Sequence, residues 1–331
     1  RRANDEGGLR RDVRMKPKVL FVREKWACDP ALGPSDGDGM VRCFNSLGLG
    51  EATYFYYDEW MAANGWQKPD AALTALWLRE KPDLVVFTVL MQYGDKNVSK
   101  GVYGAMLREV PVVGVWHEGV APDVVRVADE YADCVSFNLF LDTQDQFTRH
   151  TKRPEKCLGL FDPRDPADFQ GEAVARDIPV SFIGTLTARP VRCSHVHTLV
   201  ASGIPVASVS GPRGLFWMGR EQYATILRRS KIALNFSDAA DFRHYKGRVA
   251  EATLAGAMLM ELENPETPKI LREFIDYVPF SNERDLFDKV QHYLAHEEER
   301  AAIAASGQAR AREMLDGREF WKRVFEKAGL I

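Results

Sequence analysis

The chain has 331 residues, of which 45% are hydrophobic and 27% charged, and its formal net charge is −3. This composition excludes a fibrous or wholly disordered chain, and the small net charge excludes a global field that would concentrate nucleic acid or anionic membrane. Because the length exceeds that of one ordinary hydrophobic core, we expect two domains of about 150 residues each.

Cysteine usage and hydropathy predict where the protein resides. The five cysteines are an odd number and contain no Cys-x-x-Cys pair, which argues against a disulfide framework and favours a reducing compartment. No run approaches the ~18 apolar residues of a membrane span, and no signal-peptide core is evident. We therefore expect a soluble, cytoplasmic protein, in which the arginine-rich residues 1–15 form a flexible leader.

The first half of the chain reads as strands alternating with helices. The run Val19–Val22 is short and apolar, as a buried strand requires, and a loop rich in Gly, Pro, Ser and Asp follows it. Comparable runs, separated by stretches mostly long enough for helices, are 53–57, 84–88, 112–116 and 134–137. This alternation predicts a parallel sheet in a domain spanning residues 16–165.

The second half repeats the alternation after a linker. Two prolines within 161–166 mark the linker, and residues 166–315 are predicted to form the second domain. Its expected strands are 179–183, 206–208, 232–236, 258–261 and 277–280. The chain from Glu283 onward reads as helices, and residues 316–331 form a last helix that could return to the N-terminal domain. We thus expect an α/β protein whose two doubly wound, Rossmann-like domains face each other across a cleft.

The segment 244–257 contains the most informative group of candidate ligand-binding residues in the sequence. If a helix begins near Gly247, its free N–H groups favour a phosphate, to which Lys246 and Arg248 add positive charge. Glu251 lies about one turn further on, where its carboxylate can accept hydrogen bonds from a ribose diol. The alternative is a solvated helix face with an ion pair between Arg248 and Glu251.

This segment resembles the donor-site signature of the group 1 glycosyltransferases, in particular the CgeB-like branch. The residues that carry the resemblance are Lys246, Gly247 and Arg248, followed by Glu251-Ala252 and then Gly256. The resemblance implies the GT-B fold, a nucleotide-sugar donor and transfer of a sugar. It implies neither a metal ion nor a cofactor beyond the nucleotide-sugar co-substrate, whose base is open.

The resemblance extends upstream and assigns further donor-binding residues. The run Ser181–Thr185 is similar to the strand and turn that open the family's C-terminal domain, so Gly184 and Thr185 are expected at the donor. A basic residue of this region, Arg189 or Arg192, would contact the donor phosphates.

The sequence departs from the family where a second glutamate normally precedes the one that matches Glu251. The position eight residues before Glu251 is Arg243. Arg243 or His244 would then meet the sugar or its phosphate, which leaves donor choice and stereochemistry open.

The N-terminal half offers candidates on the acceptor side of the cleft. His117 and Glu118 directly follow a predicted strand, where α/β sites are built, and His117 resembles the family's strand-end histidine that faces the donor hexose. A hydrogen-bonded loop histidine is the alternative. If the enzyme inverts, Glu118, Asp36 or Asp38 would be the base.

Glycines around these aspartates form an acceptor-side loop. The loop comprises Asp36, Gly37, Asp38 and Gly39, and its glycines let backbone approach a ligand. It lacks the full dinucleotide fingerprint, so a nicotinamide enzyme is not expected.

No metal site is expected. Cys193, His195 and His197 fall on a predicted helix at a spacing of two, which directs them to different sides. Asp238 and Asp241 could suggest metal-binding carboxylates, but the resemblance implies basic residues and helix dipoles in that role.

These readings predict a metal-independent, retaining glycosyltransferase. The catalytic candidates are His117, Glu118, Arg189 and Lys246. The acceptor is unidentified and could be a glycan, a lipid-linked sugar, a protein, a small molecule or a modified DNA base, without integral membrane contact. The alternatives are a nucleotide-sugar 2-epimerase and a catalytically degenerate nucleotide-binding module.

Overall fold

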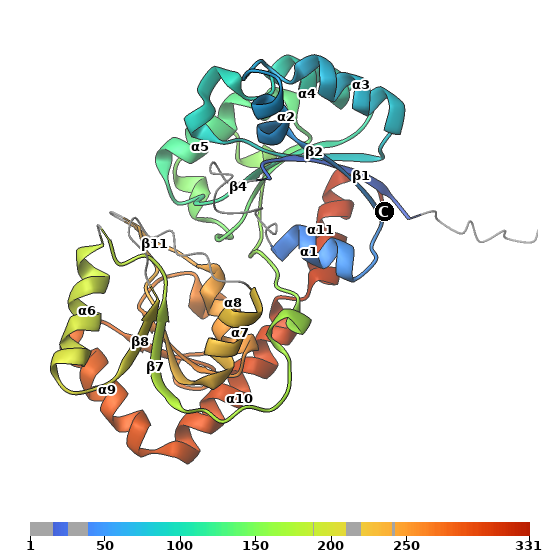
Figure 1. The fold of residues 1–331 in the computed structure, drawn as a ribbon. Helices are drawn as coiled ribbons and strands as arrows, with labels where there is room; N and C mark the ends of the chain where they lie inside the picture. Colours follow the sequence, from blue (N-terminus) through green and yellow to red (C-terminus); the bar gives the residue numbers. More distant parts are fainter. Residues whose placement is uncertain (1–15, 26–38, 188, 210–219, 240–241) are drawn as a thin grey trace, which may run out of the picture.

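Short apolar runs form two parallel sheets, and each sheet is the centre of one α/β domain (Figure 1). In the computed structural model, residues 16–25, 39–187, 189–209, 220–239 and 242–331 are described. Within these ranges, no helix is both long and apolar enough to cross a bilayer. The predicted fold class, two doubly wound domains, is confirmed.

The N-terminal domain is built on six parallel strands in the order β2-β1-β3-β4-β5-β6. They are β1 (Lys18–Arg23), β2 (Glu51–Tyr56), β3 (Leu84–Thr88), β4 (Val112–Trp116), β5 (Phe137–Phe140) and β6 (Cys157–Gly159). The connecting helices are α1 (Gly39–Ser46), α2 (Tyr57–Ala63), α3 (Asp70–Glu80), α4 (Lys100–Leu107) and α5 (Pro122–Glu130). Short 3-10 turns are η2 (Met91–Lys96), η3 (Ala132–Cys134), η4 (Gln146–Arg149) and η5 (Pro154–Lys156).

Both faces of the inner strands β1, β3, β4 and β5 are buried, which explains their runs of apolar residues. Leu20 and Val22 pack into the cluster beneath α3, α4 and α5. Val19 and Phe21 point to the opposite face and pack with Phe44 of α1. Alternate residues of β1 therefore fill two separate cores, as expected for a parallel sheet.

The C-terminal domain repeats this plan with five parallel strands in the order β13-β12-β9-β7-β8. They are β7 (Ile178–Ile183), β8 (Val206–Val209), β9 (Ser230–Asn235), β12 (Met258–Leu262) and β13 (Val278–Phe280). The helices are α6 (Pro190–Ala201), α7 (Arg220–Arg229), α8 (Gly247–Leu254), α9 (Glu283–Ala295) and α10 (Glu297–Met314). The turns η6 (Pro166–Phe169) and η8 (Thr267–Lys269) complete the connections.

Two segments cross between the domains. The first is the chain after β6, where the Asp162 carboxylate accepts a hydrogen bond from the Met40 N–H at the start of α1 (2.9 Å). The second leads from α10 into α11 (Gly317–Ala328), which lies against α1 in Figure 1. Trp321 of α11 is fully buried, and its indole N–H donates to the Met40 carbonyl at 2.9 Å. The C-terminal helix is therefore part of the N-terminal domain's core.

Two local features differ from the sequence prediction. The strand predicted at 134–137 is wrong in position, because Ala132–Cys134 forms the turn η3 and β5 begins only at Phe137. A short antiparallel pair, β10 (Asp238–Ala239) and β11 (Phe242–Arg243), was not predicted. Such short strands carry too little pattern to be distinguished from a loop.

Candidate functional site

The start of α8 lies at the carboxyl edge of the second sheet, beside the ends of β9 and β12. Lys246 is the extended residue before the helix, and Gly247 is its first residue. The first turn of α8 contains no acidic side chain, so its free N–H groups and the helix dipole favour an anion. A Cβ at Gly247 would lie 2.0 Å from the Arg164 guanidinium, so the missing side chain leaves room for this guanidinium.

Arg248 is held from three directions. Its Nε donates to Asn235 Oδ1 at 3.0 Å, and one terminal nitrogen donates to the Ile183 carbonyl at 3.2 Å. Its guanidinium also lies over the Phe182 ring, 5.6 Å from the centroid. A Cβ at Gly184 would lie 2.7 Å from this guanidinium, so Gly184 makes room for it.

Glu251 lies one turn further along α8, and both of its oxygens are engaged. Oε1 accepts from Arg164 Nε at 3.0 Å, and Oε2 accepts from the Tyr223 hydroxyl at 2.5 Å. The alternative ion pair is not formed, because Arg248 turns to Asn235 instead. Each carboxylate oxygen can accept a second hydrogen bond, which leaves Glu251 able to bind a diol.

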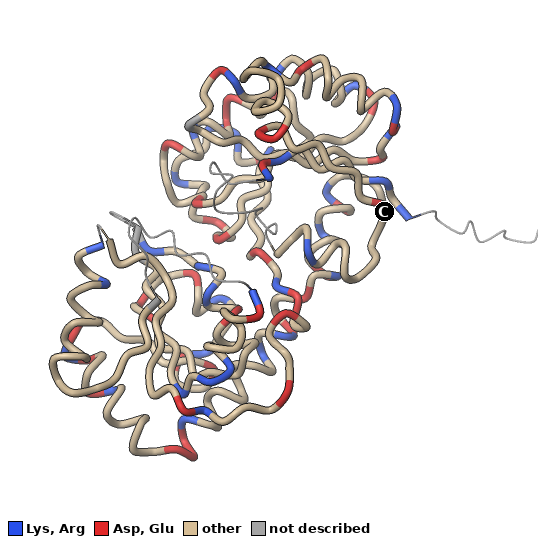
Figure 2. Tube along the Cα trace, viewed as in Figure 1, with Lys and Arg blue, Asp and Glu red and all other residues tan. Residues whose placement is uncertain are grey.

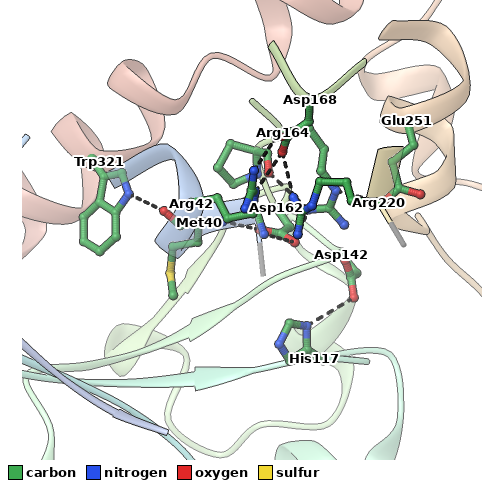
Figure 3. Close-up of polar contacts among 12 residues, drawn as sticks. Met40, Arg42, His117, Asp142, Asp162, Arg164, Asp168, Arg220, Glu251 and Trp321 are labelled. Atoms are coloured by element: carbon green, nitrogen blue, oxygen red, sulfur yellow. Dashed lines mark hydrogen bonds and ion pairs between the residues drawn. The ribbon is translucent and has the colours of Figure 1, made fainter. Parts of the chain in front are cut away.

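Arg164 connects the first crossing segment, the chain after β6, to this site. It lies between the carboxylates of Asp162 and Glu251, with which it forms ion pairs (Figure 3). Burial lowers the pKa of Arg164, but the two carboxylates outweigh burial and raise it well above its usual value. Acidic and basic residues gather together at this junction between the domains (Figure 2). The Asp162–Arg164–Glu251 chain thereby joins α1 to α8.

Histidine and acidic residues at the ends of β4 and β5 face α8 from the N-terminal domain. Glu118 Oε1 accepts from Lys246 Nζ at 3.2 Å. His117 Nδ1 lies 3.8 Å from Asp142 Oδ2, and both residues appear in Figure 3. Glu118 and Asp142 have φ values of 58° and 67°, which is uncommon outside glycine and marks a constrained loop.

The charges of this cluster shift one another's pKa values. Burial raises the pKa of Glu118, but the nearby Lys246 and His244 outweigh it and lower the value. Burial likewise raises the pKa of Asp142, and His117, Lys246 and His244 lower it below its usual value. Both carboxylates are therefore ionised at neutral pH.

His244 is fully buried beside this cluster. Its backbone N–H donates to the Ser237 carbonyl at 3.2 Å. Burial, together with the positive charge of Lys246, lowers the pKa of His244 to about 4. The imidazole therefore stays neutral at pH 7 and well below it, whereas a histidine with its unperturbed pKa of about 6.5 is still partly protonated at pH 7.

The remaining predicted donor residues lie around the same edge. Arg192 is buried in α6 and donates to the Thr185 carbonyl at 3.3 Å, and Arg189 immediately precedes that helix. Arg243 is exposed and donates to the Glu263 carbonyl at 2.9 Å. Hydrogen bonds thus join Arg192 to the turn after β7 and Arg243 to the loop after β12.

The predicted acceptor-side loop lies mostly outside the described residues. Asp36, Gly37 and Asp38 fall in the range 26–38, and only Gly39 is described. Gly39 begins α1, where a Cβ would lie 1.6 Å from the Pro163 carbonyl oxygen. This close approach gives Gly39 a packing role at the domain junction.

Sequence reasoning missed several residues of the site. Asp162 and Arg164 were interpreted only as linker, although a pair of opposite charges flanking a proline could have indicated a fixed segment. Tyr223, Asn235 and Asp142 come from distant parts of the chain, and nothing in their local pattern points to α8.

Within the described ranges, no three His, Cys, Asp or Glu side chains are arranged to hold a metal ion. In the segment Cys193-x-His195-x-His197, Cys193 is exposed on α6 whereas His195 is buried. The two side chains therefore point to different sides of their helix.

One family model matches part of this chain, and the matched part includes the start of α8. Residues 195–319 match a family model described as glycosyl transferase-like. A search of curated proteins found no match. The matched region contains α8 and the strands β9 and β12 that surround its start.

Solved structures similar to this chain share its full two-domain architecture. HepE from Anabaena in complex with UDP is 12% identical, with a TM-score of 0.62 over 95% of this chain and 100% of HepE. An α-glucosyltransferase in complex with UDP is 10% identical, with a TM-score of 0.62 over 94% and 99%. Sucrose-phosphate synthase from Thermosynechococcus elongatus is 10% identical, with a TM-score of 0.60 over 94% and 99%. The predicted GT-B fold is thus confirmed.

Proposed function

We propose that this GT-B glycosyltransferase takes its sugar from a UDP-sugar and transfers it to an acceptor bound by the N-terminal domain, with retention of configuration and without a metal ion. One observation carries the proposal: the first turn of α8, Lys246 and Arg248 present positive charge together at the carboxyl edge of the second sheet. Two similar structures are complexes with UDP, which makes UDP the first nucleotide to test and UDP-sugars the first donors.

The leaving diphosphate would bind at the start of α8. As the bond between sugar and phosphate breaks, negative charge accumulates on the diphosphate, and positive groups already in place stabilise that charge most in the transition state. Lys246 and Arg248 would supply this stabilisation, with Arg192 or Arg189 approaching from α6. This cationic cradle supports a mechanism without a metal ion.

Glu251 would hold the ribose. Its two oxygens are fixed by Arg164 and Tyr223, so the carboxylate is oriented before the nucleotide arrives. A ribose diol would use the remaining acceptor capacity of these oxygens. Preorganisation of this kind lowers the entropy lost on binding.

The sugar would extend toward His117 on the opposite side of the cleft. Asp142 lies beside His117 Nδ1 and would orient the imidazole toward the hexose. Glu118 has a lowered pKa and is paired with Lys246, which makes it a weak base. Glu118, the one candidate base among the described residues, is thus poorly suited to an inverting reaction, which supports retention.

The acceptor would enter at the carboxyl edge of the first sheet. A hollow of about 590 Å³ lies between the segment after β3 and helix α5. A second hollow, of about 570 Å³, shares the lining residues Met91, Gly94 and Asp95 with the first. Trp66 lines the second hollow and is 47% exposed. A half-exposed indole, with Lys96 Nζ over its ring, and polar walls suit a polar ligand with apolar faces, such as a saccharide.

A non-catalytic nucleotide-binding module is the second candidate, and one observation favours it. Arg243 occupies the position of the family's second glutamate, and its side chain turns to the Glu263 carbonyl. The usual carboxylate contact to the donor sugar would then be missing. Such a module would bind UDP and UDP-sugars without turnover.

Release of UDP from UDP-glucose, UDP-galactose and UDP-N-acetylglucosamine distinguishes the transferase from the module. A 2-epimerase assay on the same donors without an acceptor tests the epimerase alternative. A transferase releases UDP faster when a saccharide mixture is added, and Lys246→Ala abolishes the release. Arg229→Ala is the matched control, because Arg229 forms an exposed pair with Asp177 away from α8. UDP binding with no turnover of any donor would favour the module.

A further inference from the structure

Glu261 is a fully buried carboxylate that the proposed reaction does not use directly. It lies near the carboxyl end of β12, opposite Asn235 in the register between β12 and β9. Oε1 accepts from Asn235 Nδ2 at 2.6 Å and from the Ser237 hydroxyl. Among the described residues, no hydrogen bond of good geometry reaches Oε2, although Thr267 and Asn264 lie near the carboxyl group and oppose the rise in its pKa that burial causes. Burying a carboxylate costs several kcal/mol, so its presence calls for a role beyond packing.

The Asn235 side chain connects Glu261 to Arg248 through its two ends. An amide side chain has a donor end and an acceptor end, and contact with a carboxylate fixes which end faces it. Because Nδ2 donates to Glu261, Oδ1 faces the opposite way, where it accepts from Arg248 Nε at 3.0 Å. A flipped amide would set its N–H groups against the N–H of Arg248, which is repulsive.

Arg248 is therefore held at the end of a directed chain of hydrogen bonds. Its Nε and one terminal nitrogen are bound to Asn235 and to the Ile183 carbonyl, and Phe182 supports its face. A guanidinium has five N–H donors in a fixed fork. The remaining N–H donors of Arg248 lie in the plane of the guanidinium, which these contacts fix. The orientation of this plane therefore decides which phosphate oxygens Arg248 can reach.

We propose that Glu261 is a positioning residue for the donor diphosphate, acting through the Asn235 amide to hold the Arg248 guanidinium toward the start of α8. This inference rests on the proposed function, because it assigns Arg248 to the diphosphate. Glu261 itself contacts no substrate. The hydrogen-bond chain needs only Oε1 of Glu261, which accepts from the Asn235 amide. A glutamine at this position keeps an oxygen that can accept this hydrogen bond.

The first part of the test needs no nucleotide. Exchange of the Arg248 Nε–H with solvent is followed by NMR in the wild type, Glu261→Gln and Glu261→Met, with folding of each variant checked by circular dichroism. Slow exchange is expected in the wild type and in Glu261→Gln, and fast exchange in Glu261→Met. Slow exchange in Glu261→Met would overturn the proposal.

The second part compares UDP with uridine, which lacks the diphosphate. Glu261→Met is expected to weaken UDP binding roughly tenfold, the loss of one charge-assisted hydrogen bond, and to leave uridine binding unchanged. In an Arg248→Ala background the same change is expected to have no further effect, as for two residues that act in one chain. Glu261→Gln is expected to bind both ligands as the wild type does.

The outcomes distinguish this proposal from the proposed function. Equal losses of UDP and uridine in Glu261→Met would show a merely structural role and overturn the proposal. Additive losses with Arg248→Ala would overturn it too. If the exchange pattern is as expected but the wild type binds no UDP, the donor site itself is refuted, and the positioning role is refuted with it.

Discussion

Lys246 donates a hydrogen bond from Nζ to Glu118 Oε1 at 3.2 Å, and this ion pair joins the residue before α8 to the loop after β4. The two partners belong to different domains, so the pair links the start of α8 to the first domain. A diphosphate bound at α8 would compete with Glu118 for the same ammonium group. The pair therefore holds Lys246 in place while the donor is absent.

Removing this competitor is expected to strengthen nucleotide binding. Glu118→Gln keeps the size of the side chain but removes the negative charge, so Lys246 becomes fully available to the diphosphate. Because the pair is partly exposed, it is worth at most ~1 kcal/mol, which corresponds to up to about a fivefold gain in UDP affinity. Isothermal titration calorimetry measures the gain; Glu155→Gln, an exposed substitution away from the cleft, serves as control. A weaker affinity in Glu118→Gln would contradict competition.

His244 is expected to make stability depend on pH. Its folded pKa of about 4 lies below the unfolded value of 6.5, so the folded state resists protonation. Its contribution is fully present above pH 6.5 and is lost as the pH falls toward 4, by up to about 3 kcal/mol. Urea unfolding of the wild type and His244→Asn at pH 7, 6 and 5 measures this. The stability difference between the two proteins should change across this interval; a constant difference would refute the assignment.

Trp321 is expected to fasten α11 to the N-terminal domain. Trp321→Ala removes a fully buried ring and the hydrogen bond to Met40, at a cost of about 3–5 kcal/mol. Trp321→Phe loses mainly the hydrogen bond, at about 1–2 kcal/mol. Chemical denaturation of both variants tests this, with Trp66→Phe as an exposed control expected to change stability by at most ~0.5 kcal/mol. Equal effects at the two positions would contradict the packing of α11.

Arg164 is expected to matter for stability as well as for the site. Arg164→Met leaves the carboxylates of Asp162 and Glu251 without their shared cation, which costs about 3–5 kcal/mol for a buried network. Arg229→Met, which breaks an exposed pair, should have a far smaller effect. Urea unfolding compares the two, and a similar loss in both would contradict the burial of this network.

The sequence was sufficient to predict the architecture but less so its details. Short apolar runs such as Val19–Val22 are buried on both faces, and this requirement is visible in the residues themselves. The strand expected at 134–137 was displaced because Cys134 belongs to a turn that follows α5. Its apolar neighbours fit a strand and a buried turn equally well.

For the candidate site too, the sequence was sufficient to predict one part and not the other. Lys246, Gly247, Arg248 and Glu251 are consecutive or one turn apart, so their proximity could be predicted from helical geometry alone. The partners that orient them could not. Arg164, Tyr223 and Asn235 reach α8 only through the tertiary fold, and no local pattern indicates that Glu251 and Arg248 are held by different residues.

The central claim is that the start of α8 binds the diphosphate of a UDP-sugar without a metal ion, and thermal stabilisation by UDP in EDTA tests it most directly. A ligand that binds only the folded state stabilises it by about 2.7 kcal/mol at a concentration 100-fold above its Kd. We expect UDP to raise the Tm of the wild type and of Arg229→Ala, with uridine giving a smaller rise and Lys246→Ala losing most of the UDP effect. An unchanged Tm in the wild type, or an equal rise in Lys246→Ala, would contradict the claim.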